Sequence, residues 1–415
     1  MKLSIIICLY NSDKTLLEEC IKSIKMSTLA PGAAAGIDYE ICAYDDGSSI
    51  DYSDLVQMYG LKYKRAENKG IFGARLAALD MAEGEYIAFV DSDDTVSFNY
   101  HRPMVEKADT LEADIIINDW AFNTRSARYY CSADNTISDY IDLEGEECLE
   151  AFLRQEGVYH SWYVLWNKVF RASLLREVAA VVKPVAEGDA PFNYSEDALM
   201  CFHAFRLSKK VVNIHTGYYF YRIHDSQSVN IISEERLRRQ IDCMTTTLDN
   251  MRAFIPEGER REELLAHVDA WSAMMSRSHY SHARAARYEA LYPYIKEKYG
   301  VDELRRATHA DGRCYIKHAL LPKNIEAREA ALFELWRSGA EEARYPRMDG
   351  YAAISVDYIG RLGKEIRYSR RAAVRIPRRR IKLRSRIIHN YVVFKIGMLL
   401  FKKGSRIRNF LKKWA

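Results

Sequence analysis

Residues 85–94 read EYIAFVDSDD, an apolar run that ends abruptly in acidic residues. Residues 86–90 have the continuous hydrophobicity of a buried strand in a parallel sheet, so Asp91, Asp93 and Asp94 must follow the carboxyl end of that strand. Open α/β sheets bind their ligands at that end. Because carboxylates this close repel one another, the pattern indicates a divalent cation with oxygen ligands, Mg²⁺ or Mn²⁺. A solvated acidic turn that caps the next helix is the alternative interpretation.

The length and composition are those of a globular protein with more than one domain. The chain has 415 residues, of which 48% are hydrophobic and 28% are charged. The net charge of +4 hides an asymmetry, because residues 361–415 are rich in lysine and arginine and contain a single acid, Glu365. Such a basic end predicts contact with an anionic surface, either a membrane or a nucleic acid.

The eight cysteines are scattered, without a CxxC pair or a Cys/His cluster. Several fall inside apolar segments, as free core thiols do, so we expect a reducing cytoplasm rather than disulfides or a zinc site. The N-terminal apolar run is too short for a signal-peptide core. No stretch of about 18 uninterrupted apolar residues predicts a membrane-spanning helix.

Strands and helices alternate over the first hundred residues. Apolar runs predict strands, and apolar residues at helical spacing predict helices between them. The strands are expected at residues 3–9, 39–44, 62–66 and 86–90, and the helices around residues 16–24 and 74–81. This alternation predicts a parallel sheet with right-handed crossovers. Polar residues follow each strand and therefore converge on one edge of the sheet, which favours a single nucleotide-binding crevice over unrelated surface turns.

Three later segments carry further polar signals. Residues 162–175 form an aromatic-rich run with a single amide and a single lysine. The motif SEDALM, residues 195–200, predicts the start of a helix with Ser195 as its cap and two acids in its first turn. A strand predicted over residues 211–222 ends in a polar group that begins at His224.

Five motifs together resemble a bacterial family-2 glycosyltransferase of the GT-A fold, of the inverting, surface-polysaccharide type. In chain order they are LSIIICLYN, YEICAYDDGS, NKGIFGARLAAL, GEYIAFVDSDD and SEDALM. The resemblance covers about residues 1–230, and its strength lies in the order and spacing rather than in any one motif. It implies an α/β fold with a Rossmann-like, mixed, mainly parallel sheet flanked by helices, followed by a mostly α-helical C-terminal region.

Three regions are predicted from this resemblance and from the change in composition along the chain. Residues 1–232 would form the GT-A catalytic domain, residues 233–358 a helical domain, and residues 359–415 a basic amphipathic tail. The helical region could contact the acceptor, form homo-oligomers, or only buttress the catalytic domain.

The resemblance implies a nucleotide-sugar donor, usually a UDP-sugar. Leu9 and Tyr10 would flank the base, and Asp46, with Asp45 beside it, would accept a hydrogen bond from the base N–H. The other residues that the family pattern assigns to the base, ribose and diphosphate are Asn68, Arg75, Asp91 and Ser92.

The resemblance also implies a metal cofactor, Mn²⁺ or Mg²⁺. Asp93, with Asp91 and Asp94 nearby, would hold the ion against the diphosphate, where a Lewis acid stabilises the charge of the leaving group. His224 resembles a late motif that reaches the diphosphate or metal in some relatives, and a surface histidine without this role explains it equally well.

Asp197 occupies the position where the family places its catalytic base. Glu196 would orient Asp197 or bind an acceptor hydroxyl; alternatively, both are first-turn acids favoured by the helix dipole. Trp166, Asn167 and Lys168 could line the acceptor side, since flat aromatic faces suit sugar rings, although core packing explains the tryptophan nearly as well.

We therefore predict an inverting glycosyltransferase that moves a hexose or N-acetylhexosamine to a hydroxyl of a cell-surface glycan or lipid-linked acceptor. A catalytically silent sugar-nucleotide-binding or membrane-scaffolding protein is one alternative. A metal-dependent nucleotidyltransferase is another, but such an enzyme would require a Gly-rich basic loop after the first strand, which this sequence lacks. The missing GxGxxG argues against a dinucleotide-binding oxidoreductase, and the missing QxxRW-type signature argues against a processive synthase.

The basic tail mixes Lys and Arg with Phe, Trp and Ile, which suits peripheral attachment to an anionic membrane. This predicts a location at the cytoplasmic face of the plasma membrane. Nucleic-acid binding is not expected, because the tail has no recognised motif and the rest of the chain is acidic. A solvated helical end remains the third interpretation.

Overall fold

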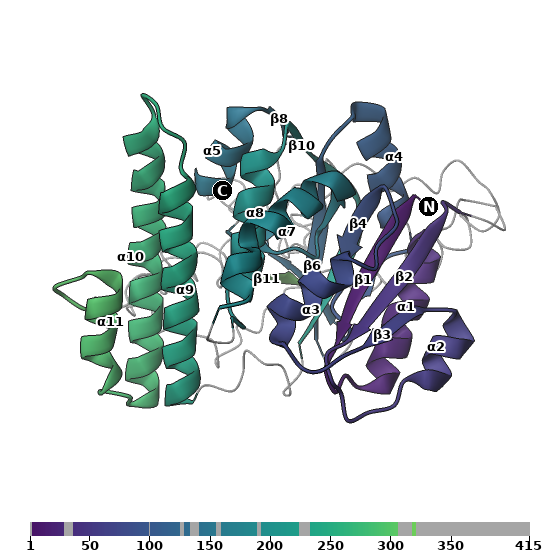
Figure 1. The fold of residues 1–415 in the computed structure, drawn as a ribbon, viewed down its shortest axis with the longest axis horizontal. Helices are drawn as coiled ribbons and strands as arrows, with labels where there is room; N and C mark the ends of the chain where they lie inside the picture. Colours follow the sequence, from purple (N-terminus) through teal and green to yellow (C-terminus); the bar gives the residue numbers. More distant parts are fainter. Residues whose placement is uncertain are drawn as a thin grey trace, which may run out of the picture. The chain divides into compact units, whose positions relative to one another are not determined.

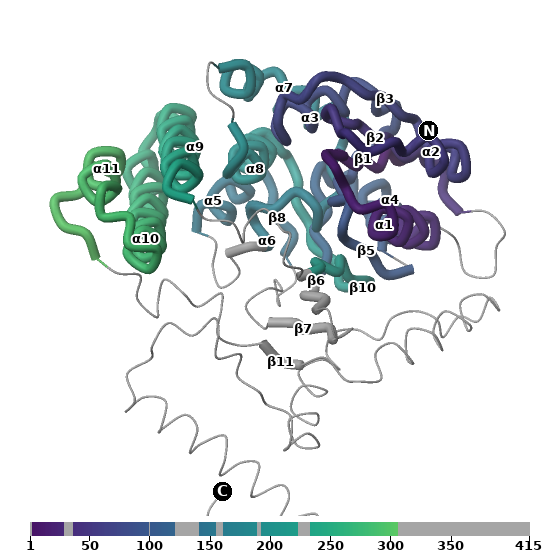
Figure 2. Tube along the Cα trace, turned by 90° about the horizontal axis from the view of Figure 1, so that it is seen from below, coloured from purple at the N-terminus to yellow at the C-terminus, as the bar shows by residue number. Residues whose placement is uncertain are grey.

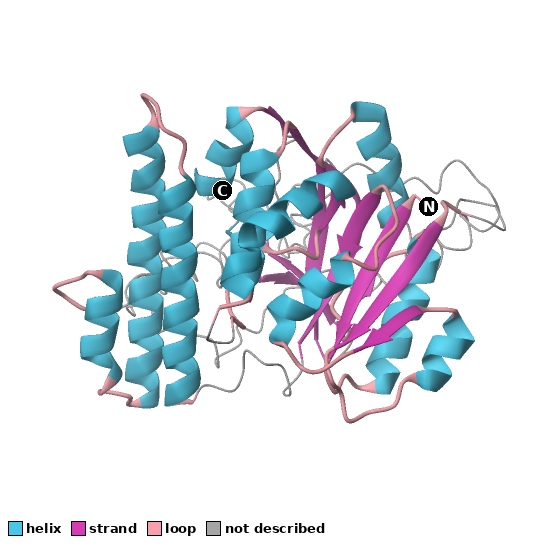
Figure 3. Cartoon of the chain, in the orientation of Figure 1, coloured by secondary structure: helices cyan, strands magenta, loops and turns pink. Residues whose placement is uncertain are grey.

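A mixed β-sheet runs through the first half of the chain, and helices cover both of its faces (Figure 1). The computed structural model describes residues 2–28, 36–98, 100–124, 128–132, 141–154, 159–188, 192–223, 233–305 and 318–320. The predicted α/β class, with a helical region after the sheet, is confirmed. Figure 3 shows the strands gathered in one layer between helices.

The first half of the sheet is parallel. Strand β1 pairs in parallel with both β2 and β4, and β2 pairs in parallel with β3. These strands span Leu3–Leu9 (β1), Tyr39–Asp45 (β2), Lys62–Arg65 (β3) and Tyr86–Phe89 (β4). The helices between them span Lys14–Ser27 (α1), Ser53–Tyr59 (α2) and Gly70–Leu79 (α3). The carboxyl ends of β1, β2 and β4 therefore lie at one edge, as the sequence predicted.

The second half of the sheet contains antiparallel strands. Strand β9 lies antiparallel between β4 and β6, and β10 pairs in parallel with β6. The short β5 and β8 pair antiparallel with β10, and β7 pairs antiparallel with β6. The strands span Thr95–Val96 (β5), Ile115–Thr124 (β6), Arg128–Ser132 (β7), Asp142–Glu144 (β8), Lys168–Arg171 (β9), Lys210–Ile223 (β10) and His318–Leu320 (β11). The helices span His101–Leu111 (α4), Glu146–Arg154 (α5), Tyr159–Tyr163 (α6), Ala172–Ala186 (α7) and Glu196–Leu207 (α8).

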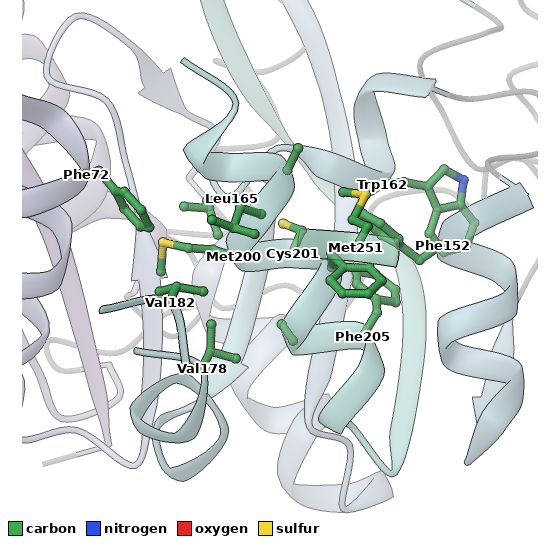
Figure 4. Packing of buried hydrophobic residues seen from close by; sticks show 14 of the residues in the cluster. Phe72, Phe152, Trp162, Leu165, Val178, Val182, Met200, Cys201, Phe205 and Met251 are labelled. Carbon is green, nitrogen blue, oxygen red and sulfur yellow. The ribbon is translucent and has the colours of Figure 1, made fainter. Parts of the chain in front are cut away.

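Two apolar clusters fill the two faces of the sheet because successive side chains of a strand point in opposite directions. In β1, Ile5 and Ile7 belong to the cluster that includes α1 and α4, whereas Ile6 belongs to the cluster that includes α3, α7 and α8. Figure 4 shows part of the latter cluster, where Met200 and Cys201 of α8 lie among residues of neighbouring elements. Helix α8, which is apolar almost all round, is buried there.

Within the described residues three helices follow the main strands, and they span Glu234–Phe254 (α9), Arg261–Ala286 (α10) and Leu291–Tyr299 (α11). Helices α9 and α10 pack against the helices that cover the sheet, and α11 packs on α9 and α10. Figure 2 shows α9 and α10 side by side, with α9 nearest to α8. Met251 of α9 and Trp271 of α10 join the same apolar cluster as α8, and Trp271 meets Phe152 of α5 with ring centroids 6.0 Å apart. None of the helices in the described ranges is both long and apolar enough to cross a bilayer.

Candidate active site

The acidic turn at the end of β4 is fixed by its last carboxylate. Asp94 is 1% exposed; its Oδ2 accepts a hydrogen bond from the Tyr219 hydroxyl at 2.7 Å, and its Oδ1 accepts one from the Arg222 backbone N–H at 2.7 Å. Burial and the neighbouring acids raise the pKa of Asp94 well above its usual value. Both oxygens thus face the protein, so Asp94 anchors the turn, while Asp91 and Asp93 are only partly buried.

Tyr219 joins the two sides of this turn. Besides donating to Asp94, its hydroxyl accepts a hydrogen bond from the backbone N–H of Asp91 at 3.0 Å. Its ring is stacked on Trp166, with centroids 4.4 Å apart and planes 20° from parallel. Tyr219 was not among the predicted site residues. Its only signal is the run of four consecutive aromatic residues in β10, from Tyr218 to Tyr221, which indicates burial but no particular partner.

One arginine connects the acidic turn to the first turn of α8. Arg75 of α3 is 5% exposed. Its Nη1 donates to Glu196 Oε1 at 2.7 Å and also to Asp197 Oδ1, and its Nη2 lies 3.4 Å from Asp91 Oδ1. The structure therefore brings together acids that are more than a hundred residues apart in the sequence.

The electrostatics of this cluster are set by several acids around a single buried cation. Burial works to lower the pKa of Arg75, but Asp197, Glu196 and Asp91 together raise it above its usual value. Burial, and then the charge of Asp197, raise the pKa of Glu196 to about 8 against the opposing effect of Arg75. Desolvation raises the pKa of Asp91 to about 6, and Arg75 again opposes the rise. Carboxyl groups perturbed in this way are typical of functional sites.

The loops after β1 and β2 lie beside the acidic turn. Tyr10 is 59% exposed, while Leu9 before it is buried. Asn11 holds the two loops together, since its backbone N–H donates to Ser48 Oγ at 2.9 Å and its Oδ1 accepts from Ser49 N at 2.8 Å. Nearby, the hydroxyls of Ser12 and Ser92 lie 2.7 Å apart.

The two aspartates after β2 have different surroundings. Asp45 is fully buried and accepts from Ser48 N at 2.8 Å and from the Tyr63 hydroxyl at 2.6 Å. Asp46 accepts from the backbone N–H of Lys69 at 2.8 Å, and burial raises its pKa. Asn68 is exposed, with its Oδ1 3.2 Å from Gly70 N. Asp45 therefore shapes the loop from inside and Asp46 is also buried, whereas Asn68 lies at the surface.

Comparison with known proteins fits this arrangement. The family model described as "Glycosyl transferase family 2" matches residues 4–145, which include the acidic turn and Arg75. EpsH of Bacillus subtilis (strain 168), whose name calls it a glycosyltransferase, is 26% identical over 278 residues, covering 66% of this chain and 74% of that protein. Residues 4–145 therefore match a family-2 glycosyltransferase domain, and the chain is a glycosyltransferase.

Two further proteins are similar to this transferase. The poly(ribitol-phosphate) beta-glucosyltransferase of Bacillus spizizenii (strain ATCC 23059 / NRRL B-14472 / W23) is 41% identical over 103 residues, which are 23% of this chain and 15% of that protein. The crystal structure of S. aureus TarS 1-349 in complex with UDP-GlcNAc matches with a TM-score of 0.51 and 18% identity, covering 89% of this chain and 94% of that chain. At this identity the likeness shows a shared fold, the predicted GT-A architecture.

The residues predicted for the acceptor side of the transferase lie in the core. Asn167 is 0% exposed and Lys168 is 1% exposed. The Lys168 ammonium donates to the carbonyl oxygens of Ser161 and Val164 and to Asn167 Oδ1 at 2.6–2.7 Å, and burial lowers its pKa to about 8. Trp166 is buried against Tyr219, as described above. All three residues are therefore buried in the core next to the site, and none of them is exposed on its surface.

A divalent cation fits the transferase if the substrate supplies part of its coordination. Among the residues that the structure describes, no group of three or more His, Cys, Asp or Glu side chains has the geometry of a metal site. Asp91 and Asp93 nevertheless offer partly exposed carboxylates two positions apart on one turn. Mg²⁺ is usually held by one or two carboxylates together with substrate phosphates, so this donor set fits a cation shared with a diphosphate. His224 lies outside the described residues, as does the basic tail at residues 359–415.

Proposed function

We propose that this transferase is an inverting enzyme that moves a hexose or N-acetylhexosamine from a nucleotide sugar, most simply a UDP-sugar, to a hydroxyl group. The observation that carries the proposal is the contact of Arg75 with Asp91 on one side and with Asp197 on the other. Arg75 thereby connects Asp91, on the proposed donor side, with Asp197, the proposed base. The complex of TarS with UDP-GlcNAc supports a UDP-sugar as donor.

On the donor side, the exposed ring of Tyr10 would stack on the base, with Leu9 beneath it and Asp46 accepting a base N–H. Asn68 would lie on the base side, and Asp91 and Ser92 would approach the ribose. Asp45 supports the loop from inside through its bonds to Ser48 and Tyr63.

Asp93 and Asp91 would hold Mn²⁺ or Mg²⁺, which when bound stabilises the negative charge of the leaving diphosphate. In this proposal Asp94 is a positioning residue, because its carboxylate is already occupied by Tyr219 and Arg222. It holds the turn so that the two preceding carboxylates face the donor.

In the transfer step, Asp197 takes the proton of the acceptor hydroxyl while that oxygen attacks the anomeric carbon. The bond from that carbon to the diphosphate oxygen breaks on the opposite face, so the configuration inverts. Arg75 holds Asp197 in place, and Glu196, which keeps its proton near neutral pH, can donate a hydrogen bond beside it.

The acceptor is proposed to be a hydroxyl of a cell-surface polymer or a lipid-linked glycan. The name of the poly(ribitol-phosphate) beta-glucosyltransferase supports a polymer acceptor. We further propose the region boundaries at residues 232 and 358 given above. The basic composition of residues 359–415 supports attachment of the enzyme to an anionic membrane at the cytoplasmic face.

The test is nucleotide release by the purified full chain with Mn²⁺, offered UDP-, GDP-, CDP- and dTDP-sugars in turn. Release from one donor, abolished by EDTA and by Asp93→Asn, is expected. In transfer to an added acceptor, Asp197→Asn should lower kcat by about 10²-fold or more while nucleotide affinity is retained. Asp80→Asn, at an exposed position on the end of α3, is the matched control and should behave as the unmodified chain. A folded chain that neither binds nor cleaves any nucleotide sugar would refute the proposal and leave a scaffolding role.

A further inference from the structure

The turn that carries the proposed base is bound to α8 by a backbone hydrogen bond from Leu199 N to Ser195 O at 3.0 Å, but not by the side chain of Ser195. Asp197 is the second residue of α8, and Ser195 directly precedes that helix. The sequence predicts that Ser195 caps the helix with its side chain, and this prediction is wrong, because the side chain makes no capping hydrogen bond. The backbone of Ser195 is also left-handed, with φ at 62°, which is unfavourable for any residue except glycine. We therefore expect side-chain contacts outside α8 to help hold this conformation.

One such contact comes from α9. The hydroxyl of Ser195 lies 2.8 Å from the hydroxyl of Thr247, which is fully buried. A buried hydroxyl without a partner is costly, so the two groups are bound to each other. The Ser195 hydroxyl is thus turned away from the N–H groups of α8 and towards the helical region.

A second residue of α9 contacts the same turn. Cys243 lies four positions before Thr247 and therefore on the same face of the helix. Burial raises the pKa of the Cys243 thiol, and hydrogen bonds from the backbone N–H groups of Asn193 and Tyr194 oppose the rise. The ring of Tyr194 also lies 6.0 Å from the ring of His279 on α10. Every residue of the turn from 193 to 195 therefore meets the helical region.

The opposite side of the turn rests on the helix that carries Arg75. Asn193 is so close to Gly70, the first residue of α3, that a Cβ added there would lie 2.2 Å from Asn193 Oδ1. The base-bearing turn is therefore clamped between α9 and the start of α3. Its position determines how Asp197 meets Arg75.

We propose that α9 is a positioning element of the active site, and that Thr247 is the positioning residue that sets Asp197 through Ser195. This inference rests on the proposed role of Asp197 as base. It gives residues 234–254 a part in catalysis beyond burying apolar surface.

The test compares two threonines of the same helix. Thr247→Val removes the hydroxyl that reaches Ser195. Thr245→Val is the matched control, because Thr245 is also buried but its hydroxyl donates to the carbonyl oxygens of Ile241 and Asp242 within α9. Thr247→Val should lower kcat for transfer about two- to tenfold and leave nucleotide affinity unchanged, as expected for the loss of one hydrogen bond. Thr247→Ser should restore kcat, and Thr245→Val should not change it.

Ser195→Gly gives a second measurement, because it removes the same hydrogen bond from the other side and completes a double-mutant cycle with Thr247→Val. Glycine adopts the left-handed conformation freely but cannot bond to Thr247. In that background Thr247→Val should cause no further loss of kcat, since the bond it removes is already absent. Equal kcat values for Thr247→Val and Thr245→Val would overturn the inference while leaving the proposed function intact. Absence of transfer by the unmodified chain would overturn the proposed function instead.

Discussion

Replacing Glu196 with glutamine should stabilise the protein, and by more as the pH rises. The Glu196 carboxyl is buried and accepts a hydrogen bond from Arg75 Nη1 at 2.7 Å. Burial and the charge of Asp197 raise its pKa from 4.5 to about 8. A glutamine side-chain oxygen can accept the same hydrogen bond but never ionises.

The magnitude follows from linkage between protonation and folding. Because the folded-state pKa of Glu196 lies above its unfolded value, its contribution to stability is fully present below pH 4.5 and is lost as the pH rises towards 8. Each pKa unit corresponds to about 1.4 kcal/mol, so the wild-type chain should lose about 3 kcal/mol between pH 4.5 and pH 7 at this one group. The Glu196→Gln variant should escape that loss.

The assay is urea unfolding followed by circular dichroism at pH 5 and at pH 8. The difference in unfolding free energy between Glu196→Gln and the wild type should be small at pH 5 and several kcal/mol at pH 8. Glu289→Gln, at an exposed position, should show no such dependence. The same difference at both pH values, or a variant less stable than the wild type at pH 8, would show that the electrostatic reasoning is wrong. A stabilised variant would also indicate that Glu196 is retained for function at the expense of stability.

Two further substitutions test the acidic turn and the sheet beneath it. Tyr219→Phe keeps the stacked ring but removes the hydroxyl that joins the two sides of the turn. Mn²⁺ affinity, measured by titration in the presence of UDP, should therefore fall about 10-fold or more. Tyr280→Phe on α10 should leave the Mn²⁺ affinity unchanged, and equal affinities of the two variants would contradict the role of Tyr219. Gly84→Ala would place a Cβ 2.5 Å from the Ser4 backbone nitrogen, so it should lower the free energy of unfolding, measured in urea, by about 1–3 kcal/mol. Gly188→Ala meets no such close neighbour and should change this free energy little. Similar losses of stability in both variants would show that β1 can shift to make room.

The positions of the first strands in the sequence could be predicted, but the order of the strands in the sheet could not. Apolar runs predicted β1, β2 and β4 to within one residue of their ends, because a buried strand needs continuous hydrophobicity. Helix α3 begins at Gly70, before the apolar spacing becomes visible. The insertion of β9 between β4 and β6 had no signal, since periodicity indicates the type of an element and not its neighbour.

The same limit explains what could be predicted of the site. Polar residues after parallel strands must share an edge, and the structure places the loops after β1, β2 and β4 together. Which acid of the turn is buried depends on Tyr219, more than a hundred residues away, so sequence alone could not separate Asp94 from Asp93. Likewise, an aromatic residue close to a lysine in the sequence is compatible with either a sugar-binding surface or a buried core. Only tertiary contacts place Trp166 and Lys168 inside.

The charge of the cluster has a consequence for how the donor binds. Asp91, Asp197 and Glu196 contact Arg75, and Asp93 lies on the same turn as Asp91, so the acids outnumber the arginine even with Glu196 protonated. A diphosphate carries negative charge of its own and would be repelled by the acidic turn. A divalent cation between Asp93 and the diphosphate reverses this balance, because it adds positive charge where both partners offer hard oxygen ligands. The electrostatics therefore favour joint binding of metal and donor over binding of either alone, which is why metal affinity is best measured with the nucleotide present.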